Sequence, residues 1–351
     1  MKIAEAIRNY IVESFDKGNS SLCAQDVENL KNWFSDKKLY TGIQTLTDEG
    51  YQEMHTIAKR LKMTLPNLLS NLRQREYRFG STSKDKIEES AKAYADGFGN
   101  GSLVTDKDNI DDIVAPYVSC TKYHVDVKTN PKIYEEAAKY LKSPEYFVVK
   151  DRIQRRTGLD IKLTNDNITA LYDLCRYTWS GIDYKPSPWC ALFTSEDLQV
   201  LEYIEDLKRY YRNSYGTPMN ELLGRVVLAD LLKSFERAKL GEGRKITAYF
   251  GQSTSLDMTL SALGLFKDKV PLTGGKRIKN RKWRSCKLSA FSSNLMTILS
   301  KCDVDGKDDF AVVFYLNEQP IKSICSNGIC SWNEFENEIK TFANVNIDFC
   351  E

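Results

Sequence analysis

The chain has 351 residues, of which 42% are hydrophobic and 28% charged, and its formal net charge is +2. This composition supplies enough apolar residues for a core and no strong overall field, so it argues against a protein that binds nucleic acid or membranes through net charge. The length allows two domains. No stretch approaches eighteen apolar residues, so no membrane-spanning helix is predicted.

The first twelve residues contain charges that interrupt what would be the apolar region of a signal peptide, so no signal peptide is predicted in this chain. The segment is typical of an amphipathic helix instead. Its apolar face is expected to hold Ile3, Ala6, Ile7, Tyr10 and Ile11.

Farther along, helical patterns dominate residues 1 to 110 and again residues 117 to 240. A long helix is predicted over 195–211, because Ser195 suits an N-cap and two acids follow it. Residues 245–250 and 310–316 are short, rich in β-branched or aromatic side chains and bounded by turn residues, which predicts buried strands. The order indicates an α/β protein whose sheet resumes after a long helical region.

Several stretches carry a family pattern. Two of them read Ser187-Pro188-Trp189-Cys190-Ala191-Leu192-Phe193-Thr194 and Gly264-Leu265-Phe266-Lys267-Asp268, the second followed by Arg281-Lys282-Trp283-Arg284. The others are Leu22-Cys23-Ala24-Gln25-Asp26, Leu46-Thr47-Asp48-Glu49-Gly50 and the tail from Asn317 to Cys350. In this order they resemble the multiple inositol polyphosphate phosphatases, a phytase-like branch of the histidine acid phosphatases.

The resemblance implies a fold with two parts. One is a histidine-phosphatase-like α/β domain with helices on both faces of its sheet, expected over residues 1–110 and 239–351. The other is an inserted α-helical cap, expected over residues 111–238. The family activity that the resemblance implies is hydrolysis of phosphate monoesters through a histidine nucleophile, with arginines that clamp the phosphate and a glutamate that protonates the leaving oxygen.

The motifs for that chemistry are degenerate here. No Arg-His-Gly motif occurs in the sequence. Gly80 stands where the Arg-x-Thr-type motif of the family has arginine, while Gln252 and Thr254 stand where the His-Ala-Glu motif has histidine and glutamate. No catalytic residue is therefore predicted, because loss of single members of such a constellation already costs orders of magnitude in rate.

Three hypotheses follow from this pattern. The first is an inactive pseudophosphatase that acts as a binding or interaction protein. The second is a truncated or weakly active inositol polyphosphate or acid phosphatase. The third is a structural or secreted effector protein in which the pocket has no function. Ligand-induced stabilisation would separate the first from the third, and turnover would favour the second.

The chain has only two histidines, His55 and His124. His55 falls among polar positions of a predicted helix, and His124 precedes alternating valines, so both are interpreted as structural. Neither lies beside the cysteines or the second histidine that a metal site requires. No metal and no cofactor are predicted.

A small anion is the predicted ligand, with inositol phosphate as the example that the resemblance suggests. The candidate anion-binding residues are Arg78, Lys84, Lys86 and Gln252. A second basic group comprises Lys276, Arg277, Lys279, Arg281, Lys282, Arg284 and Lys287. It is interpreted as a solvated loop and helix face whose charges meet acids elsewhere, and attraction of a polyanion such as an inositol phosphate is the alternative. A nucleic-acid site is disfavoured, because no binding motif accompanies the run. Whether the chain has a protein partner is left open.

Nine cysteines are scattered along the chain. The resemblance implies a secretory protein, so a disulfide framework is expected, although the pairing stays open. The candidates are Cys120, Cys175, Cys190, Cys302, Cys325, Cys330 and Cys350, and the last three form a C-terminal group. Three Asn-x-Ser/Thr sequons, at Asn19, Asn100 and Asn167, are compatible with a secreted glycoprotein.

Overall fold

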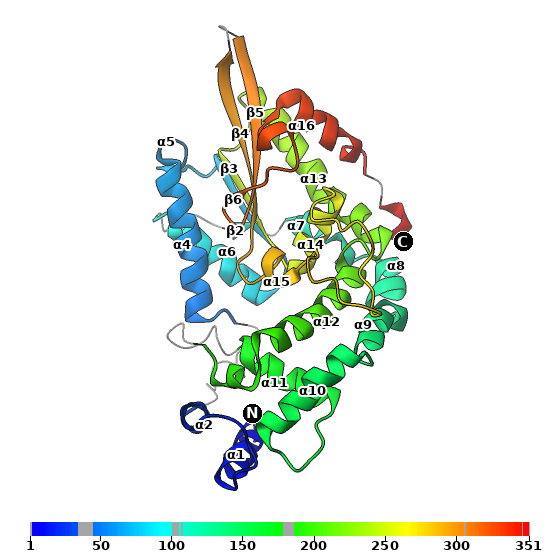
Figure 1. Cartoon of the computed structure of the whole chain (residues 1–351). Helices are drawn as coiled ribbons and strands as arrows, with labels where there is room; N and C mark the ends of the chain where they lie inside the picture. The colour runs from blue at the N-terminus through cyan, green and yellow to red at the C-terminus, as the bar shows by residue number, and fades with distance from the viewer. Residues whose placement is uncertain are drawn as a thin grey trace. The chain divides into compact units, whose positions relative to one another are not determined.

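The computed structural model describes residues 2–33, 45–99, 105–106, 108–177, 186–304, 307–345 and 347–350 (Figure 1). The chain forms two compact units. Unit 1 comprises Met1–Ile43, Tyr134–Lys208 and Thr273–Lys279, and unit 2 comprises Gln44–Ile133, Arg209–Leu272 and Asn280–Glu351. These bounds differ from the ranges expected for a sheet domain and a cap, because residues 1–43 lie with the helical unit and residues 209–238 lie with the sheets.

In its described part, unit 1 is built from helices and connecting loops. Its elements are α1 (Lys2–Asp16), α2 (Ala24–Lys31), α9 (Glu135–Tyr140), α10 (Pro144–Thr157), α11 (Asn165–Tyr177), η5 (Pro188–Leu192) and most of α12 (Ser195–Asn213). Trp33 and Trp189 meet edge to face with ring centroids 5.3 Å apart, and Tyr140 and Tyr203 do the same at 4.9 Å. Such aromatic pairs anchor the core of this unit.

The predicted N-terminal helix is present, but its apolar stripe is only partly covered. Ile11 is fully buried, whereas Tyr10 is 57% exposed. Ala6 is exposed and Ile7 is half-buried, and the side chain of Ile3 lies outside the described residues. The apolar face is therefore wider than the contact that covers it.

Unit 2 contains a parallel sheet of three strands in the order β2–β1–β3, formed by Thr105–Asp106, Tyr77–Ser81 and Ile246–Phe250. Side chains alternate between its faces. Phe79 and Phe250 pack with α4 (Asp48–Thr64) and α6 (Asp85–Gly97) in one hydrophobic cluster. On the opposite face, Gly80 and Tyr249 lie against α7 (Ile110–Val114) and α13 (Pro218–Lys239). Helices thus cover both faces of this sheet, as Figure 1 shows.

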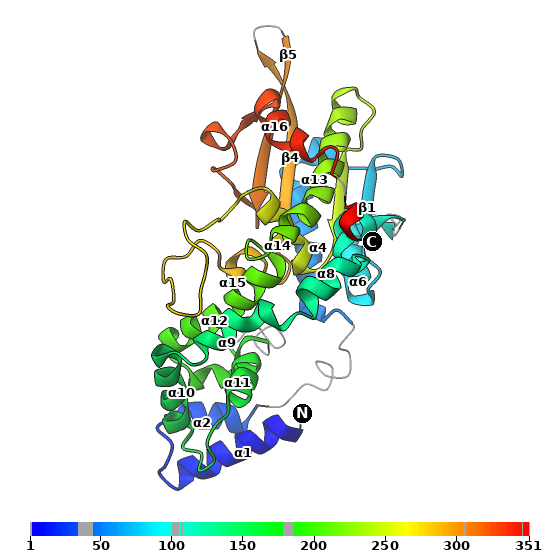
Figure 2. The ribbon, with the colours of Figure 1, turned by 90° about the vertical axis from the view of Figure 1, so that its right-hand side faces the viewer.

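A second sheet is formed by the antiparallel hairpin β4 (Leu295–Val304) and β5 (Lys307–Leu316), with β6 (Gln319–Pro320) and β7 (Cys330–Ser331) paired to β5. Helix α16 (Trp332–Ile339) lies beside the hairpin in Figure 2 and packs on it through Phe314 and Phe335. The predicted strands 245–250 and 310–316 correspond to β3 and β5, and the mixed α/β class is confirmed.

The remaining elements of unit 2 are short except for α14. They are α5 (Pro66–Leu69), η1 (Pro116–Val118), α8 (Thr121–Tyr123), η2 (His124–Lys128), α14 (Ser253–Ala262), α15 (Ser285–Leu288), η6 (Ser326–Gly328), η7 (Lys340–Phe342) and η8 (Asp348–Cys350). Segment η3 (Pro131–Tyr134) spans the point where unit 2 passes into unit 1. Among the helices described, none is both long enough and apolar enough to cross a membrane.

Three disulfides are present, Cys120–Cys350, Cys175–Cys190 and Cys325–Cys330. The C-terminal group is thus split, because Cys350 pairs with Cys120 and not with its neighbours. Cys302, an expected disulfide candidate, is a free thiol. The reason is its register on β4, which places it opposite Asp309 of β5.

Candidate functional site

The sequence positions Gly80, Gln252 and Thr254 come together because β1 and β3 are parallel neighbours. Gly80 pairs with Tyr249 in the sheet, and the backbone N–H of Thr82 donates to the carbonyl of Phe250 at 3.0 Å. Both strands then end on the same edge, where Gln252 occupies the N-cap position of α14 and Thr254 lies in its first turn. Ligands of parallel α/β sheets bind at such carboxyl edges.

A direct hydrogen bond joins two of the predicted anion-binding residues. The Lys84 Nζ donates to Gln252 Oε1 at 2.9 Å. Lys84 precedes α6 and Gln252 precedes α14, so the bond links the residues that follow the two strands. The amide NH2 of Gln252 stays turned away from this bond and can donate to a further acceptor.

The other two predicted anion-binding residues lie elsewhere. Arg78 is on the α13 face of β1, where its Nε donates to Asp106 Oδ2 at 2.9 Å and its Nη2 donates to the carbonyl of Asp108 at 2.8 Å. Its Nη1 also donates to the Tyr249 hydroxyl, at 3.3 Å. The guanidinium is thus engaged inside the protein. Lys86 lies exposed in the first turn of α6.

Gly80 is held in a tight space. A Cβ at this position would lie 2.3 Å from Ile110 Cδ1 and 2.9 Å from Ile110 Cγ1. Ile110 is fully buried at the start of α7. A larger residue at Gly80 therefore requires Ile110 to move, and this packing could not be read from the sequence.

Additional polar groups collect at the same edge. The hydroxyls of Ser81 and Thr82, at the end of β1, are buried and have no hydrogen-bond partner among the described residues. Helix α14 begins without a side-chain cap. The Ser255 N–H donates to the Gln252 carbonyl at 2.9 Å, whereas no side-chain cap takes the N–H groups of Ser253 and Thr254. Exposed helix N–H groups and the helix dipole favour an anion.

Arg209 and Asp257 form a polar cluster behind the first turn of α14 that the sequence interpretation missed. Arg209 Nη1 donates to Ser253 Oγ at 3.1 Å and to Ser289 Oγ at 3.2 Å, and lies 3.6 Å from Asp257 Oδ2. Asp257 is fully buried, and burial raises its pKa, while the nearby Arg209 opposes that rise. The sequence feature that could have indicated this cluster is an aspartate between the apolar residues Leu256 and Met258.

Both histidines have structural surroundings. His55 is half-buried on α4, where its ring stacks on that of Tyr51 with centroids 6.1 Å apart. His124 Nε2 lies 2.8 Å from the carbonyl of Val118, which can only accept, so this nitrogen carries the hydrogen. In the described ranges no group of three or more metal-ligating side chains gathers to hold an ion.

The second basic group is largely engaged. Arg277 is buried in unit 1, where it forms ion pairs with Glu145 and Glu196. The Lys282 and Trp283 N–H groups donate to the carboxylate of Asp268 at 2.8 and 3.1 Å. The interpretation of the run as a solvated surface is therefore wrong for Arg277 and Arg281, both of which are buried.

Comparison with known proteins gives a consistent result. The family described as histidine phosphatase superfamily (branch 2) matches residues 9–317. Multiple inositol polyphosphate phosphatase 1 of Drosophila melanogaster is 30% identical over 350 residues, which is 97% of this chain and 73% of that protein. The Homo sapiens protein of the same name is 26% identical over 312 residues, which is 82% of this chain and 64% of that protein.

Solved structures show the same fold. The phytase from D. castellii superposes with a TM-score of 0.76 at 16% identity, covering 99% of this chain and 77% of that one. The Bifidobacterium longum multiple inositol polyphosphate phosphatase in complex with inositol hexasulfate gives a TM-score of 0.71 at 12% identity, covering 99% and 90%.

Proposed function

The chain belongs to branch 2 of the histidine phosphatase superfamily, and we propose that it uses this fold to bind an inositol polyphosphate, or another small anion, without hydrolysing it. The observation that carries the proposal is the Lys84–Gln252 pair at the carboxyl edge of β1 and β3. It places a cation and an amide donor where parallel sheets bind ligands.

Anion binding is supported by the set of donors at this edge. The Lys84 ammonium has N–H groups beyond the one given to Gln252, and the Gln252 amide can donate as well. The uncapped start of α14 adds backbone donors and a favourable dipole. The buried hydroxyls of Ser81 and Thr82 supply donors that no described residue uses.

The absence of turnover is supported by the side chains at the three degenerate positions. Glycine, glutamine and threonine occupy positions 80, 252 and 254. None of them can take a phosphoryl group as an imidazole does, and a threonine hydroxyl does not protonate a leaving group near neutral pH. His55 is on α4 and His124 is in η2, whereas Lys84 and Gln252 follow the strands β1 and β3.

We also propose that the chain passes through the secretory pathway. Three disulfides support this, because such bonds form and persist in oxidising compartments.

The test separates binding from turnover. Binding is measured by calorimetry with inositol hexasulfate, which contains no phosphate ester, and turnover is measured as phosphate released from inositol hexakisphosphate. We expect saturable binding that weakens about tenfold in Lys84→Ala, because a hydrogen bond to a charged group contributes about 1.5–3 kcal/mol. Release of phosphate should not exceed the blank.

The matched control is Lys92→Ala, which removes an exposed lysine of α6 outside the carboxyl edge. Equal weakening in both variants would show a general charge effect and reject the site. Binding that is undetectable in the unmodified chain would reject the ligand class, and phosphate release above the blank would reject the non-catalytic part.

A further inference from the structure

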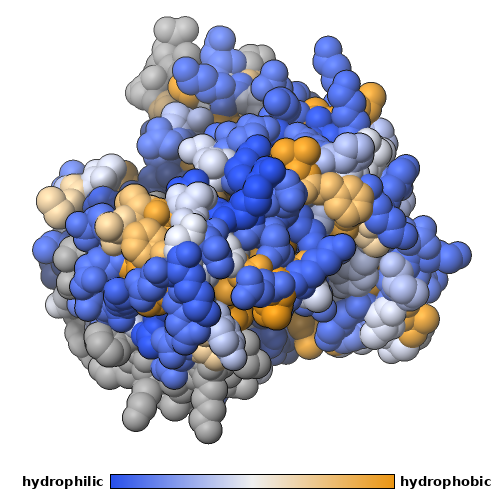
Figure 3. All heavy atoms as spheres, turned by 60° about the horizontal axis from the view of Figure 1, so that its bottom comes forward, coloured by the Kyte–Doolittle hydropathy of each residue, from blue (hydrophilic) through white to orange (hydrophobic). Residues whose placement is uncertain are grey.

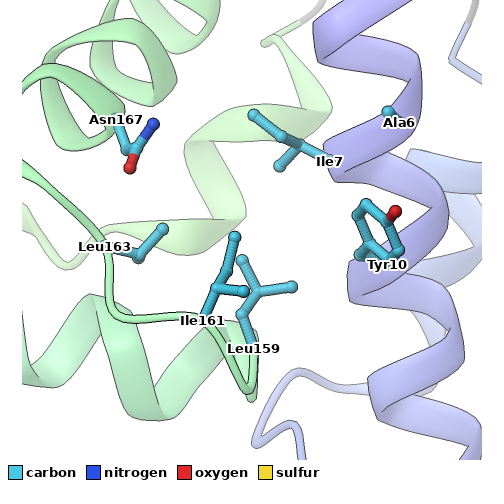
Figure 4. Close-up of a pocket in the computed structure, with 7 residues that line it drawn as sticks. All are labelled: Ala6, Ile7, Tyr10, Leu159, Ile161, Leu163 and Asn167. Atoms are coloured by element: carbon cyan, nitrogen blue, oxygen red, sulfur yellow. The ribbon is translucent and has the colours of Figure 1, made fainter.

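Unit 1 has an apolar groove with one polar residue in its wall. It measures about 360 Å³ and is lined by Ala6, Ile7 and Tyr10 of α1, by Leu159, Ile161 and Leu163, and by Asn167 of α11. Figure 4 shows the α1 residues facing the loop that follows α10, with Asn167 across from α1 and above Leu163. On the face drawn in Figure 3, apolar residues form small patches separated by hydrophilic ones.

The groove is preformed, because its loop wall is fixed by hydrogen bonds. Gln154 Nε2 donates to the carbonyls of Leu159 and Ile161 at 2.7 and 3.0 Å, and its Oε1 accepts from the N–H of Leu163 at 2.7 Å. Gly158, at φ 64°, ends α10, and its carbonyl accepts from the Ser14 hydroxyl of α1. This bond joins the α1 wall of the groove to the start of the loop that forms its other wall.

Asn167 is also the acceptor position of the sequon Asn167-Ile168-Thr169. Its Oδ1 accepts from the N–H and the hydroxyl of Thr164, each at 2.9 Å, which holds the side chain in one orientation at the start of α11. The Nδ2 atom makes none of these bonds. In a sequon, Nδ2 is the atom that carries the sugar.

We propose that Asn167 carries an N-linked glycan whose first sugar residue packs into this groove, on Tyr10 and Ile161. The sugar arrives from a lipid-linked oligosaccharide diphosphate. The Nδ2–C1 bond forms, the bond from C1 to the diphosphate oxygen breaks, and one Nδ2 proton leaves as the lipid diphosphate departs. The inference rests on the proposed passage through the secretory pathway and not on anion binding.

The exposed side chains of Tyr10 and Ile161 support a sugar as the occupant of the groove. Tyr10 is 57% exposed and Ile161 is 62% exposed, although both lie on a preformed apolar surface. A pyranose presents C–H groups on one face and hydroxyls on the other, so it can cover an aromatic ring and an aliphatic side chain while its polar face stays in water. A sugar attached at this sequon starts from Asn167 in the wall of the groove.

The other described sequon differs. Asn19 is exposed in the turn after α1 and is not among the residues that line this groove. Asn100 lies outside the described residues. Asn19 therefore provides a control for glycosylation that has no packing partner.

The first measurement establishes the modification. The full chain is expressed behind a secretory leader in a eukaryotic host and analysed by mass before and after endoglycosidase treatment. Asn167→Asp keeps the Oδ1 acceptor that Thr164 uses, and Thr169→Ala keeps the asparagine itself. Each should remove the mass of one glycan. A glycan-free Asn167 in the secreted unmodified chain would overturn the proposal.

The second measurement tests the packing. Removal of the Asn167 glycan should lower Tm by about 2 °C. In a domain of 150–250 residues this shift corresponds to a loss of up to about 1 kcal/mol in the free energy of unfolding. Tyr10→Ala should abolish that difference, while Tyr10→Phe keeps it. Phe147→Ala changes another exposed aromatic of unit 1, and Asn19→Asp changes the other sequon; both should leave the difference intact. A difference that survives Tyr10→Ala would overturn the packing.

These readouts are independent of the anion site. Mass and Tm of the glycan variants do not involve Lys84 or Gln252, which lie in unit 2. A chain that binds no anion can still show the glycan effect, and a chain without the glycan can still bind the anion.

Discussion

At the residue scale, glycine at position 80 leaves a space that the side chain of Ile110 fills. Ile110 occupies the space that a side chain at position 80 would need, with its Cδ1 only 2.3 Å from the site of a Cβ. We predict that Gly80→Ala lowers the free energy of unfolding by about 1–3 kcal/mol, the usual cost of overpacking a core. Denaturant unfolding measures it.

The matched test is the double variant Gly80→Ala with Ile110→Val, which removes the clashing Cδ1. Ile110→Val alone should cost about 0.5–1.5 kcal/mol, and the pair should cost less than the sum of the two single changes. Strict additivity would mean that Ile110 does not fill the space beside Gly80.

Asp257 gives a pH-dependent prediction. Burial raises its pKa in the folded protein above the ordinary value of 3.8, so the folded state holds this proton more tightly than the unfolded state. The contribution of Asp257 to stability is therefore greatest below the unfolded pKa and is lost as pH rises through the folded pKa. Relative to Asp257→Asn, the unmodified chain should lose stability across that window.

The measurement is urea unfolding of both proteins from about pH 4 to about pH 8. Asp160→Asn, which changes an exposed aspartate with no ion pair among the described residues, serves as the control and should show no such divergence. A stability difference that is constant with pH, or a gain in stability of the unmodified chain relative to Asp257→Asn as pH rises, would contradict the assignment.

The sequence identified the substitutions at Gly80, Gln252 and Thr254 but not their surroundings. The hydrogen bond from Lys84 to Gln252 depends on the pairing of β1 with β3, which are far apart in the chain. Arg78 and Lys84 both belong to the stretch that resembles the Arg-x-Thr-type motif, yet alternation along β1 turns Arg78 toward Asp106 and Tyr249.

At the element scale, the disulfides link segments over very different lengths of chain. Cys120–Cys350 closes a sequence separation of 230, and Cys175–Cys190 closes one of 15. Loop-closure entropy gives about 5 kcal/mol for the long loop and about 3 kcal/mol for the short one. We predict that replacing Cys120 and Cys350 with serine destabilises the protein more than replacing Cys175 and Cys190.

Unfolding by denaturant without reductant measures both pairs. Cys23→Ser is the control, since Cys23 is exposed and its Sγ caps α2 by accepting from the N–H of Asp26, a role that serine retains. It should change stability by less than about 0.5 kcal/mol. A larger loss from the short loop than from the long one would contradict the entropic argument.

Elements with a strong local pattern were predictable. The helix expected over 195–211 is α12, Ser195–Asn213, and the strand expected over 245–250 is β3. Strand β4 was missed, because Thr297, Ser300 and Lys301 interrupt its apolar residues and its hairpin partner β5 decides its conformation. Local sequence patterns could not predict that Cys350 pairs with Cys120, which is 230 residues away.

At the scale of the whole molecule, the division into units could not be read from periodicity. The boundary between Lys208 and Arg209 falls inside α12. Sequence periodicity sees one continuous helix there, whereas the contacts of Arg209 and Asn213 with Asp257 join its last turn to the sheet unit. A helix is a local structure, but a unit is defined by long-range contacts.

The proposal that the molecule binds an anion without turnover makes a final prediction about repair. Gln252→His combined with Thr254→Glu rebuilds the imidazole and the carboxylic acid of the family's third motif. We predict that this variant still releases no phosphate from inositol hexakisphosphate above a blank. The nucleophilic imidazole of the first motif and its arginine clamp are not restored, so no phosphoenzyme can form.

The two changes are best measured separately as well as together. Gln252→His removes the oxygen that accepts from Lys84, so affinity for inositol hexasulfate changes even though chemistry does not follow. A burst of phosphate from the unmodified chain, abolished by replacing His55 or His124, would show that one of these histidines acts as a nucleophile. Because His55 stacks on Tyr51 and His124 is bonded to the Val118 carbonyl, either would first have to leave its present partner.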